Sequence, residues 1–293
     1  MNAVPVGLGP TLGLLYASTF WGLVWYPTRL LEQAGIAGAW LTLVGYGAAL
    51  LVFLPFLRLS PADLRQRPAD LAVLTLAAGW TNLAFVLAVL EGEVVRVILL
   101  FYLSPVWTVL LGRWLLGEPL TGRTALMLAP GLAGAVIMLW DPAIGHVPLN
   151  RADLLALSAG LAFALNNVMV RRIEHIGIRA KTGLAWFGVV LVSMPFALLG
   201  SGGVPDVPAA AWIGTLLLGV CGFMFSTLAV VYGVSNMPVQ RSAVIMLFEL
   251  IVGAATAWWL AGELVELRDW IGGILIISAA MLAVFQREER QTP

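Results

Sequence analysis

Apolar residues fill ten long runs of this chain, and charged or Pro/Gly-rich segments separate them. A transmembrane helix needs about 20 mostly apolar residues to cross the hydrocarbon core of a bilayer. The runs have about this length, so the pattern predicts ten membrane-spanning helices, with nine as the alternative count because two pairs of runs almost touch. The expected bounds are Thr11–Leu31, Ala39–Leu57, Asp70–Leu90, Val94–Leu116, Arg123–Trp140, Asp153–Val170, Thr182–Leu199, Ala209–Val234, Val239–Ala261 and Leu267–Phe285.

The composition points to the same class of protein. Of the 293 residues 60% are hydrophobic and only 11% are charged, whereas ordinary globular domains carry about a quarter charged residues. So few charges could not cover a soluble protein of this length, so we expect an all-α integral membrane protein. A net charge of zero argues against a nucleic-acid partner. The single cysteine, Cys221, excludes a disulfide framework and a cysteine-ligated metal site.

The basic residues predict the orientation, because cytoplasmic loops retain Lys and Arg. If the N-terminus is placed inside, twelve of the sixteen basic residues fall on the inner side. The outer side then keeps Arg29, Arg96, Arg151 and Arg268. Both termini are therefore expected in the cytoplasm.

The chain also contains an internal repeat. A shift of 145 positions superposes identical residues without a gap: Arg96 on Arg241, Trp114-Leu115 on Trp259-Leu260, and Gly117-Glu118 on Gly262-Glu263. Earlier in the chain, a shift of 140 to 142 pairs Arg29 with Arg171 and Pro55-Phe56 with Pro195-Phe196. We therefore expect two five-helix repeats, residues 1–145 and 146–293. Because five is odd, the second repeat is inverted, and inverted repeats that meet near the midplane are typical of secondary transporters.

Ten helices, the five-plus-five repeat and a Pro…Gly-Glu pattern at the end of the fourth run resemble the drug/metabolite transporter superfamily, EamA type. The resemblance covers essentially the whole chain and extends to a bacterial exporter of aromatic amino acids. It implies a multi-pass protein of the bacterial inner membrane, monomer or homodimer, that exports small metabolites without a cofactor. One departure is Glu249-Leu250, since the family pattern usually has a mid-helix proline there.

Pro105 and Glu249 are the two most informative residues inside the predicted spans. A proline inside a helix cannot donate its hydrogen bond and clashes with the carbonyl four residues earlier, here that of Phe101. Pro105 is thus either a hinge or a static kink. A mid-span carboxylate costs about 3 kcal/mol or more. Glu249 could bind a substrate ammonium or carry a coupling proton, and the alternative is a protonated acid that is hydrogen-bonded inside the bundle.

Other polar and aromatic residues also lie at mid-depth. Asn82 in the third run and Asn166-Asn167 in the sixth are candidate ligands, or hydrogen-bonding contacts between helices. Trp40, Trp140, Trp212, Trp258, Trp259 and Trp270 lie near span ends and indicate an interfacial belt. The belt does not explain Trp21, Trp80, Tyr102, Trp107 and Phe163, which either line a pocket for an apolar or aromatic side chain or serve in packing.

These residues favour a secondary transporter that exports small metabolites, with amino acids as the expected substrates. Glu249 would receive the ammonium, the asparagines the carboxylate, and the mid-depth aromatic rings the side chain. Export of other metabolites or drugs by the same fold is the alternative. An intramembrane enzyme would need a nucleophile–base pair or metal ligands at membrane depth, and a channel would need a filter-like loop or a ring of charge. The sequence shows neither pattern, so no metal and no catalytic residue is expected.

Overall fold

The computed structural model describes residues 8–36, 38–92, 94–140, 148–200, 203–262 and 266–285. In these residues all regular structure is helical. The helices are α1 (Leu8–Leu23), α2 (Trp25–Gln33), α3 (Gly38–Phe53), η1 (Leu54–Phe56), α4 (Pro61–Gln66), α5 (Pro68–Glu91), α6 (Val94–Phe101), α7 (Ser104–Leu111), η2 (Gly112–Leu116), α8 (Gly122–Leu139), α9 (Arg151–Arg172), α10 (Ile178–Gly200), α11 (Ala209–Leu217), η4 (Leu218–Phe223), α12 (Met224–Ser235), α13 (Val239–Met246), α14 (Phe248–Ala261) and α15 (Leu267–Phe285).

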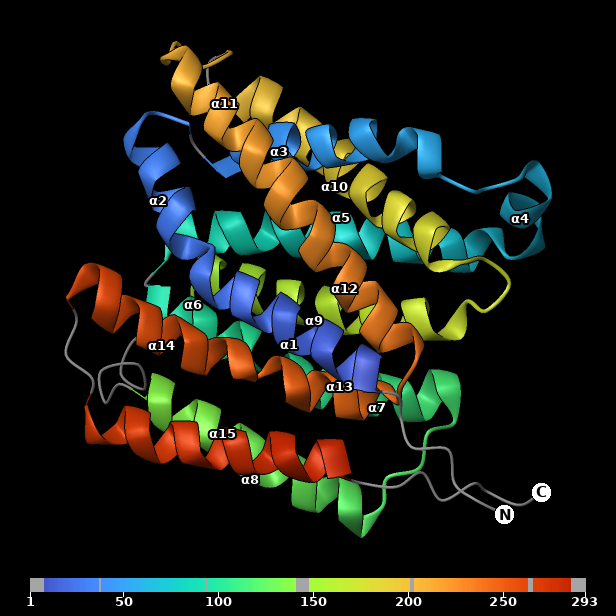
Figure 1. The fold of residues 1–293 in the computed structure, drawn as a ribbon, viewed down its shortest axis with the longest axis vertical. Coiled ribbons are helices and arrows are strands. Elements are labelled where there is room, and N and C mark those ends of the chain that lie inside the picture. The colour runs from blue at the N-terminus through green and yellow to red at the C-terminus, as the bar shows by residue number, and fades with distance from the viewer. Residues whose placement is uncertain are drawn as a thin grey trace.

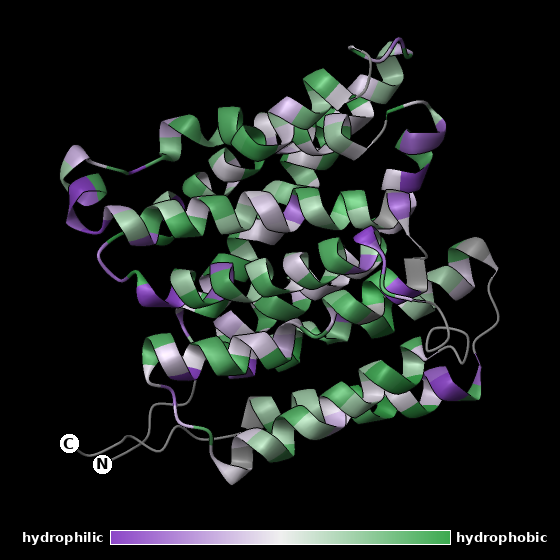
Figure 2. Cartoon of the chain, turned by 180° about the vertical axis from the view of Figure 1, so that it is seen from behind, coloured by the Kyte–Doolittle hydropathy of each residue, from purple (hydrophilic) through white to green (hydrophobic). Residues whose placement is uncertain are grey.

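Several of these helices are long and apolar enough to cross a membrane. Six stretches meet this criterion in the described part of the chain: Gly38–Phe56, Pro68–Ala88, Arg151–Arg172, Ile178–Gly200, Ala209–Ser235 and Val239–Leu260. Thr124–Leu139 is a shorter apolar helix. Figure 2 shows apolar residues along the length of the helices and hydrophilic residues gathered near the points where the helices begin and end. The prediction of an all-α protein with several membrane-length helices is confirmed.

Three of the predicted runs are broken near their middle. The first run is divided at Val24 into α1 and α2, since Pro27 has no N–H for the Leu23 carbonyl. The fourth run is divided between Phe101 and Ser104, one residue before Pro105. The ninth is divided at Leu247 without a proline. The sequence predicted only the break at Pro105.

Helices from the first half of the chain pack largely on helices from the second half. α5 packs against α9 and α10, α3 against α10, and α8 against α15. α1 packs against α12 and α14. Figure 1 shows these rods as one stack, with α3, α10 and α11 at one end and α8 and α15 at the other. The two halves therefore interleave.

Small residues allow the closest of these approaches. The Gly188 Cα leaves no room for a Cβ beside the Thr75 carbonyl, and Gly219 leaves none beside the Gly45 carbonyl. These two contacts correspond in the repeat, because residues 75 and 219 are 144 apart and residues 45 and 188 are 143 apart. Gly134 of α8 and Gly272 of α15 also lie close together, since a Cβ on Gly134 would come within 2.6 Å of the Gly272 carbonyl oxygen.

Four of the six tryptophans predicted for the interfacial belt are exposed. Trp140, Trp258, Trp259 and Trp270 are between 53% and 76% exposed, as expected of side chains at a membrane surface. Trp40 was expected among them, but the structure contradicts this because its side chain is buried. Its indole Nε1 donates to the Gly203 carbonyl at 3.1 Å, and its ring packs edge-on against Trp212.

Candidate functional site

The phenol of Tyr102 donates a hydrogen bond to Oε1 of Glu249. Tyr102 lies in the break between α6 and α7, and Glu249 lies in the first turn of α14, just after the break at Leu247. The two breaks are equivalent in the repeat, because α6 ends at Phe101 and α13 ends at Met246, 145 residues later. The contact therefore joins the two halves of the chain at matching breaks.

The surroundings of the Glu249 carboxyl group offer it a neutral partner and no cation. In the part of the chain that the structure describes, no Lys or Arg forms an ion pair with Glu249. Its side-chain partner is the Tyr102 phenol. A carboxylate at membrane depth is stabilised by a cation, by water or by a proton. Without a cationic partner among the described residues, the carboxyl group depends on the Tyr102 phenol, on water or on a proton.

Helix α1 holds α14 in place beside this carboxyl group. A Cβ at Gly22 would come within 2.6 Å of the Glu249 carbonyl oxygen, so only glycine allows the two backbones to approach so closely. The Thr256 hydroxyl donates to the Gly22 carbonyl at 3.1 Å, and the Trp25 indole donates to Thr256 at 3.0 Å. These contacts fix the first three turns of α14 against α1 and α2.

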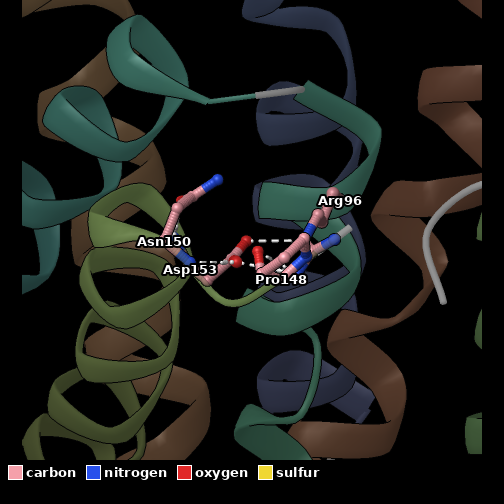
Figure 3. A network of polar contacts seen from close by, with 4 residues as sticks. All are labelled: Arg96, Pro148, Asn150 and Asp153. Carbon is pink, nitrogen blue, oxygen red and sulfur yellow. Dashed lines mark hydrogen bonds and ion pairs between the residues drawn. The ribbon is translucent and has the colours of Figure 1, made fainter. Parts of the chain in front are cut away.

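A buried ion pair fixes α6 to the start of α9 (Figure 3). Arg96 binds Asp153 with two parallel bonds, Nε to Oδ1 at 2.7 Å and Nη2 to Oδ2 at 2.8 Å. Both side chains are buried, and Asp153 also accepts from the Asn150 backbone N–H at 2.9 Å. The sequence placed Arg96 at the outer end of the fourth run. The Asn150-to-Asp153 capping box can be read from the sequence, but the distant partner Arg96 cannot.

Helices α6, α7 and α9 run side by side in a constant register. Arg96 and Asp153 are 57 residues apart, as are Leu115 and Arg172, whose guanidinium donates to the Leu115 carbonyl at 3.2 Å. Between these two contacts, the Phe101 carbonyl would lie 2.7 Å from a Cβ at Gly160, 59 residues later. The carbonyl freed by Pro105 thus lies against Gly160.

Below this point two polar residues lie level with each other. Trp107 and Asn166 are also 59 residues apart, so the same register places them at one depth. The buried Nε1 of Trp107 and the buried Oδ1 atoms of Asn166 and Asn167 have no hydrogen-bond partner among the described residues. An unsatisfied buried polar atom costs about 1–3 kcal/mol. Water or a polar ligand bound at the level of Trp107 and Asn166 would remove this cost.

Both halves of the chain match one protein family. The model of the EamA-like transporter family aligns with residues 9–140 and again with residues 150–285. The chain belongs to the EamA-like transporter family. It is therefore a member of the drug/metabolite transporter superfamily, as expected, and a transporter rather than an enzyme. Membership also implies a lipid bilayer and a small-molecule substrate.

Three relatives are similar in sequence to this EamA-family transporter. An "Uncharacterized transporter" of Archaeoglobus fulgidus is 27% identical over 80% of this chain and 84% of its own length. A "Probable terminal-alkyne amino-acid exporter" of Streptantibioticus cattleyicolor is 25% identical over 78% and 80%. A "Probable amino-acid metabolite efflux pump" of Escherichia coli is 24% identical over 61% and 63%. A crystal structure with 19% identity superposes with a TM-score of 0.71 over 94% of this chain and 96% of that chain, which shows a shared fold.

The remaining predicted site residues of this EamA-family transporter are distributed over the bundle. Phe163 lies near the first break, since its ring is 5.5 Å from that of Phe101, which packs edge-on against Tyr102. Trp21 instead stacks on Phe223 at 5.7 Å. Trp80 donates to Ser158 at 3.2 Å, and the Asn82 amide donates to its own helix at the Ala78 carbonyl. The structure therefore brings Tyr102, Phe163 and Glu249 to the breaks, with Trp107 and the two asparagines one level below.

Proposed function

We propose that this EamA-family transporter exports amino acids or similar small metabolites by alternating access through a central cavity between two inverted repeats. The observation that carries the proposal is the Tyr102–Glu249 contact, because it joins the matching breaks of both halves and presents an uncompensated carboxyl group. The names of two relatives, an amino-acid exporter and an amino-acid metabolite efflux pump, support the same substrate class.

The proposal includes ten spans, which follow from joining the broken helices. α1 with α2, α6 with α7 and η2, α11 with η4 and α12, and α13 with α14 each form one span. The packing supports an inverted relation between spans 1–5 and 6–10. The contact of α5 with α9 becomes that of α12 with α1 when the halves are exchanged, and the contact of α7 with α9 becomes that of α14 with α1. All four of these helix–helix contacts are present.

Accessibility differs between the two halves of the ninth span and supports an outward-facing state. Every residue of α13 is buried, and α13 packs against α1, α7, α8 and α15. None of the residues from Phe248 to Leu260 of α14 is buried. At the predicted inner end, Glu118 accepts from the Val239 backbone N–H at 3.4 Å, and Thr124 donates to Gln240 at 3.1 Å. The breaks, with Pro105 beside the first, are the proposed hinges.

A zwitterionic amino acid fits the chemistry of the two levels. Its ammonium would bind the Glu249 carboxylate and replace the Tyr102 phenol as partner. Its carboxylate would accept from the Trp107 indole N–H and from the Nδ2 groups of Asn166 and Asn167, whose unpaired Oδ1 atoms would accept from water. The rings of Phe101, Tyr102 and Phe163 would contact an apolar or aromatic side chain. Charge-assisted hydrogen bonds of this kind contribute about 1.5–3 kcal/mol each.

Transport of radiolabelled amino acids by the purified protein in proteoliposomes tests this proposal. Glu249→Gln keeps the shape of the side chain but removes its charge, and we expect it to lower amino-acid exchange by roughly 10- to 100-fold, which corresponds to the loss of one charge-assisted bond. Glu174→Gln, at an exposed loop position, is the matched control and should transport normally. Wild-type exchange by Glu249→Gln over a range of pH, or transport of amine-free metabolites alone, would overturn the assignment.

A further inference from the structure

A groove with a volume of about 270 Å³ lies between α2 and the end of α14, away from the Tyr102–Glu249 contact. Its lining consists of Trp25, Tyr26, Arg29, Leu30, Gln33 and Leu260. No described residue of α5, α6, α7 or α9 lines it. The groove is thus separate from the proposed substrate path. Leu260 is the second-last residue of α14, which places the groove at the predicted outer surface of the membrane.

The helical spacing of the lining residues explains why the groove faces away from the core. The five residues of α2 recur at intervals of three or four or are direct neighbours, so they share one face of the helix. The opposite face carries Leu31, which is buried in the cluster that contains Trp40 and Leu41. Between the groove and the core, the Trp25–Thr256 hydrogen bond holds α2 to α14.

Arg29 in the groove differs in its hydrogen bonding from the equivalent arginine in the second half of the chain. Arg29 corresponds to Arg171 in the repeat, 142 positions later. Arg171 donates to the Ser235 carbonyl at 2.8 Å and so has a partner within the protein. Arg29 is exposed and forms no hydrogen bond or ion pair with any residue that the structure describes. Its guanidinium group is therefore accessible to a ligand from outside the protein.

We propose that this groove binds the phosphate group of an anionic membrane phospholipid. A guanidinium group matches phosphate oxygens with two parallel hydrogen bonds, and the Gln33 amide offers a further donor. Trp and Tyr side chains favour the headgroup level of a bilayer, where Trp25 and Tyr26 form the wall. Leu30 is 50% exposed and Trp259 is 76% exposed, so the surface around the groove is apolar and suits a lipid chain.

Native mass spectrometry of the full-length protein, titrated with phosphatidylglycerol, tests the proposal. We expect one lipid to be retained more tightly than the rest, and Arg29→Gln to weaken its binding by about fivefold, the usual effect of one arginine at an anionic membrane surface. Arg268→Gln is the matched control, because Arg268 is also basic and predicted to be outer but already binds Glu266 and the Trp140 carbonyl. It should retain the lipid as the wild type does.

Two further titrations identify the recognised group and its source. Diacylglycerol, which has no phosphate, should not occupy the tight site. Glycerol phosphate should not displace the lipid at equal concentration, since it lacks the chains that contact Leu30 and Leu260. Equal lipid retention by wild type and a folded Arg29→Gln would overturn the proposal. Displacement of the lipid by an amino acid at equal concentration would also overturn it and assign the groove to the substrate.

Discussion

The two matching breaks have the same position and different chemistry. The first lies at Tyr102–Leu103 and is followed by Pro105, which removes the hydrogen bond to the Phe101 carbonyl. The second lies at Leu247, and the equivalent of Pro105 is Leu250, whose N–H donates to the Leu247 carbonyl three residues earlier. A break therefore forms at this position with or without a proline. The proline is one way to make the break, and the position is a property of the packed bundle.

Glycine contacts are the feature that the two breaks share. Gly160 of α9 lies against the Phe101 carbonyl, and Gly22 of α1 lies against the Glu249 carbonyl. Helices α1 and α9 begin the two halves and are equivalent in the proposed repeat. Each broken helix is thus supported by a glycine from the other half. The difference between the breaks is Glu249 itself, since its first-half equivalent is Ser104, and this difference indicates a role beyond the fold.

The largest effect is expected above the first break, where Arg96 anchors α6 to α9. Arg96→Met leaves Asp153 buried without its cation, which typically costs about 3–5 kcal/mol, so we expect a clear fall of the thermal unfolding midpoint in detergent. Arg151→Met is the control, because the Arg151–Glu91 pair is exposed and such pairs contribute at most about 1 kcal/mol. The double variant Arg96→Met/Asp153→Asn should recover part of the loss. Equal midpoints for the two single variants would contradict the anchor.

A smaller effect is expected from Gly160→Ala at the first break. Its Cβ would lie 2.7 Å from the Phe101 carbonyl oxygen, and overpacking of this kind costs roughly 1–3 kcal/mol. Gly273→Ala is the matched control, because no atom lies within 4 Å of a Cβ there. Thermal unfolding and amino-acid exchange should both decrease for Gly160→Ala alone. A Gly160→Ala protein as stable as Gly273→Ala would show that the glycine does not support the break.

The smallest effect is expected from exchanging the chemistry of the breaks. Pro105→Ala should keep the protein folded and lower transport by less than about threefold, because the second break forms without a proline and isolated changes of this kind cost little when the geometry persists. Leu250→Pro should be tolerated similarly, since residue 250 lies in the first turn of α14, where a proline removes only the bond to the Leu247 carbonyl. Crosslinking between cysteines at the two cavity mouths would report a shift between access states. A large loss of transport by Pro105→Ala would make the proline itself the hinge.

The sequence predicted an all-helical protein with several membrane-length helices, because apolar runs of bilayer length are a local property. It also identified Tyr102, Phe163 and Glu249 as separate candidates. It did not predict that Tyr102 and Glu249 touch, since residues 147 positions apart meet only through packing. It did not predict the Arg96–Asp153 ion pair for the same reason, because Asp153 belongs to another helix. Trp40 satisfied the belt pattern by its position near a span end, yet tertiary packing buries it.

The interleaving of the two halves also determines the order in which this protein can mature during synthesis. α1, α3, α5 and α8 leave the ribosome before α9, α10, α12 and α15, which are the helices that cover them. Until then the close-contact faces around Gly45 and Thr75 meet lipid instead of protein. α8 is the last of them to be covered, because its partner α15 is the last described helix of the chain. A nascent chain that stops before α15 would therefore remain in the membrane as an incomplete bundle. Membrane proteases degrade incomplete bundles of this kind.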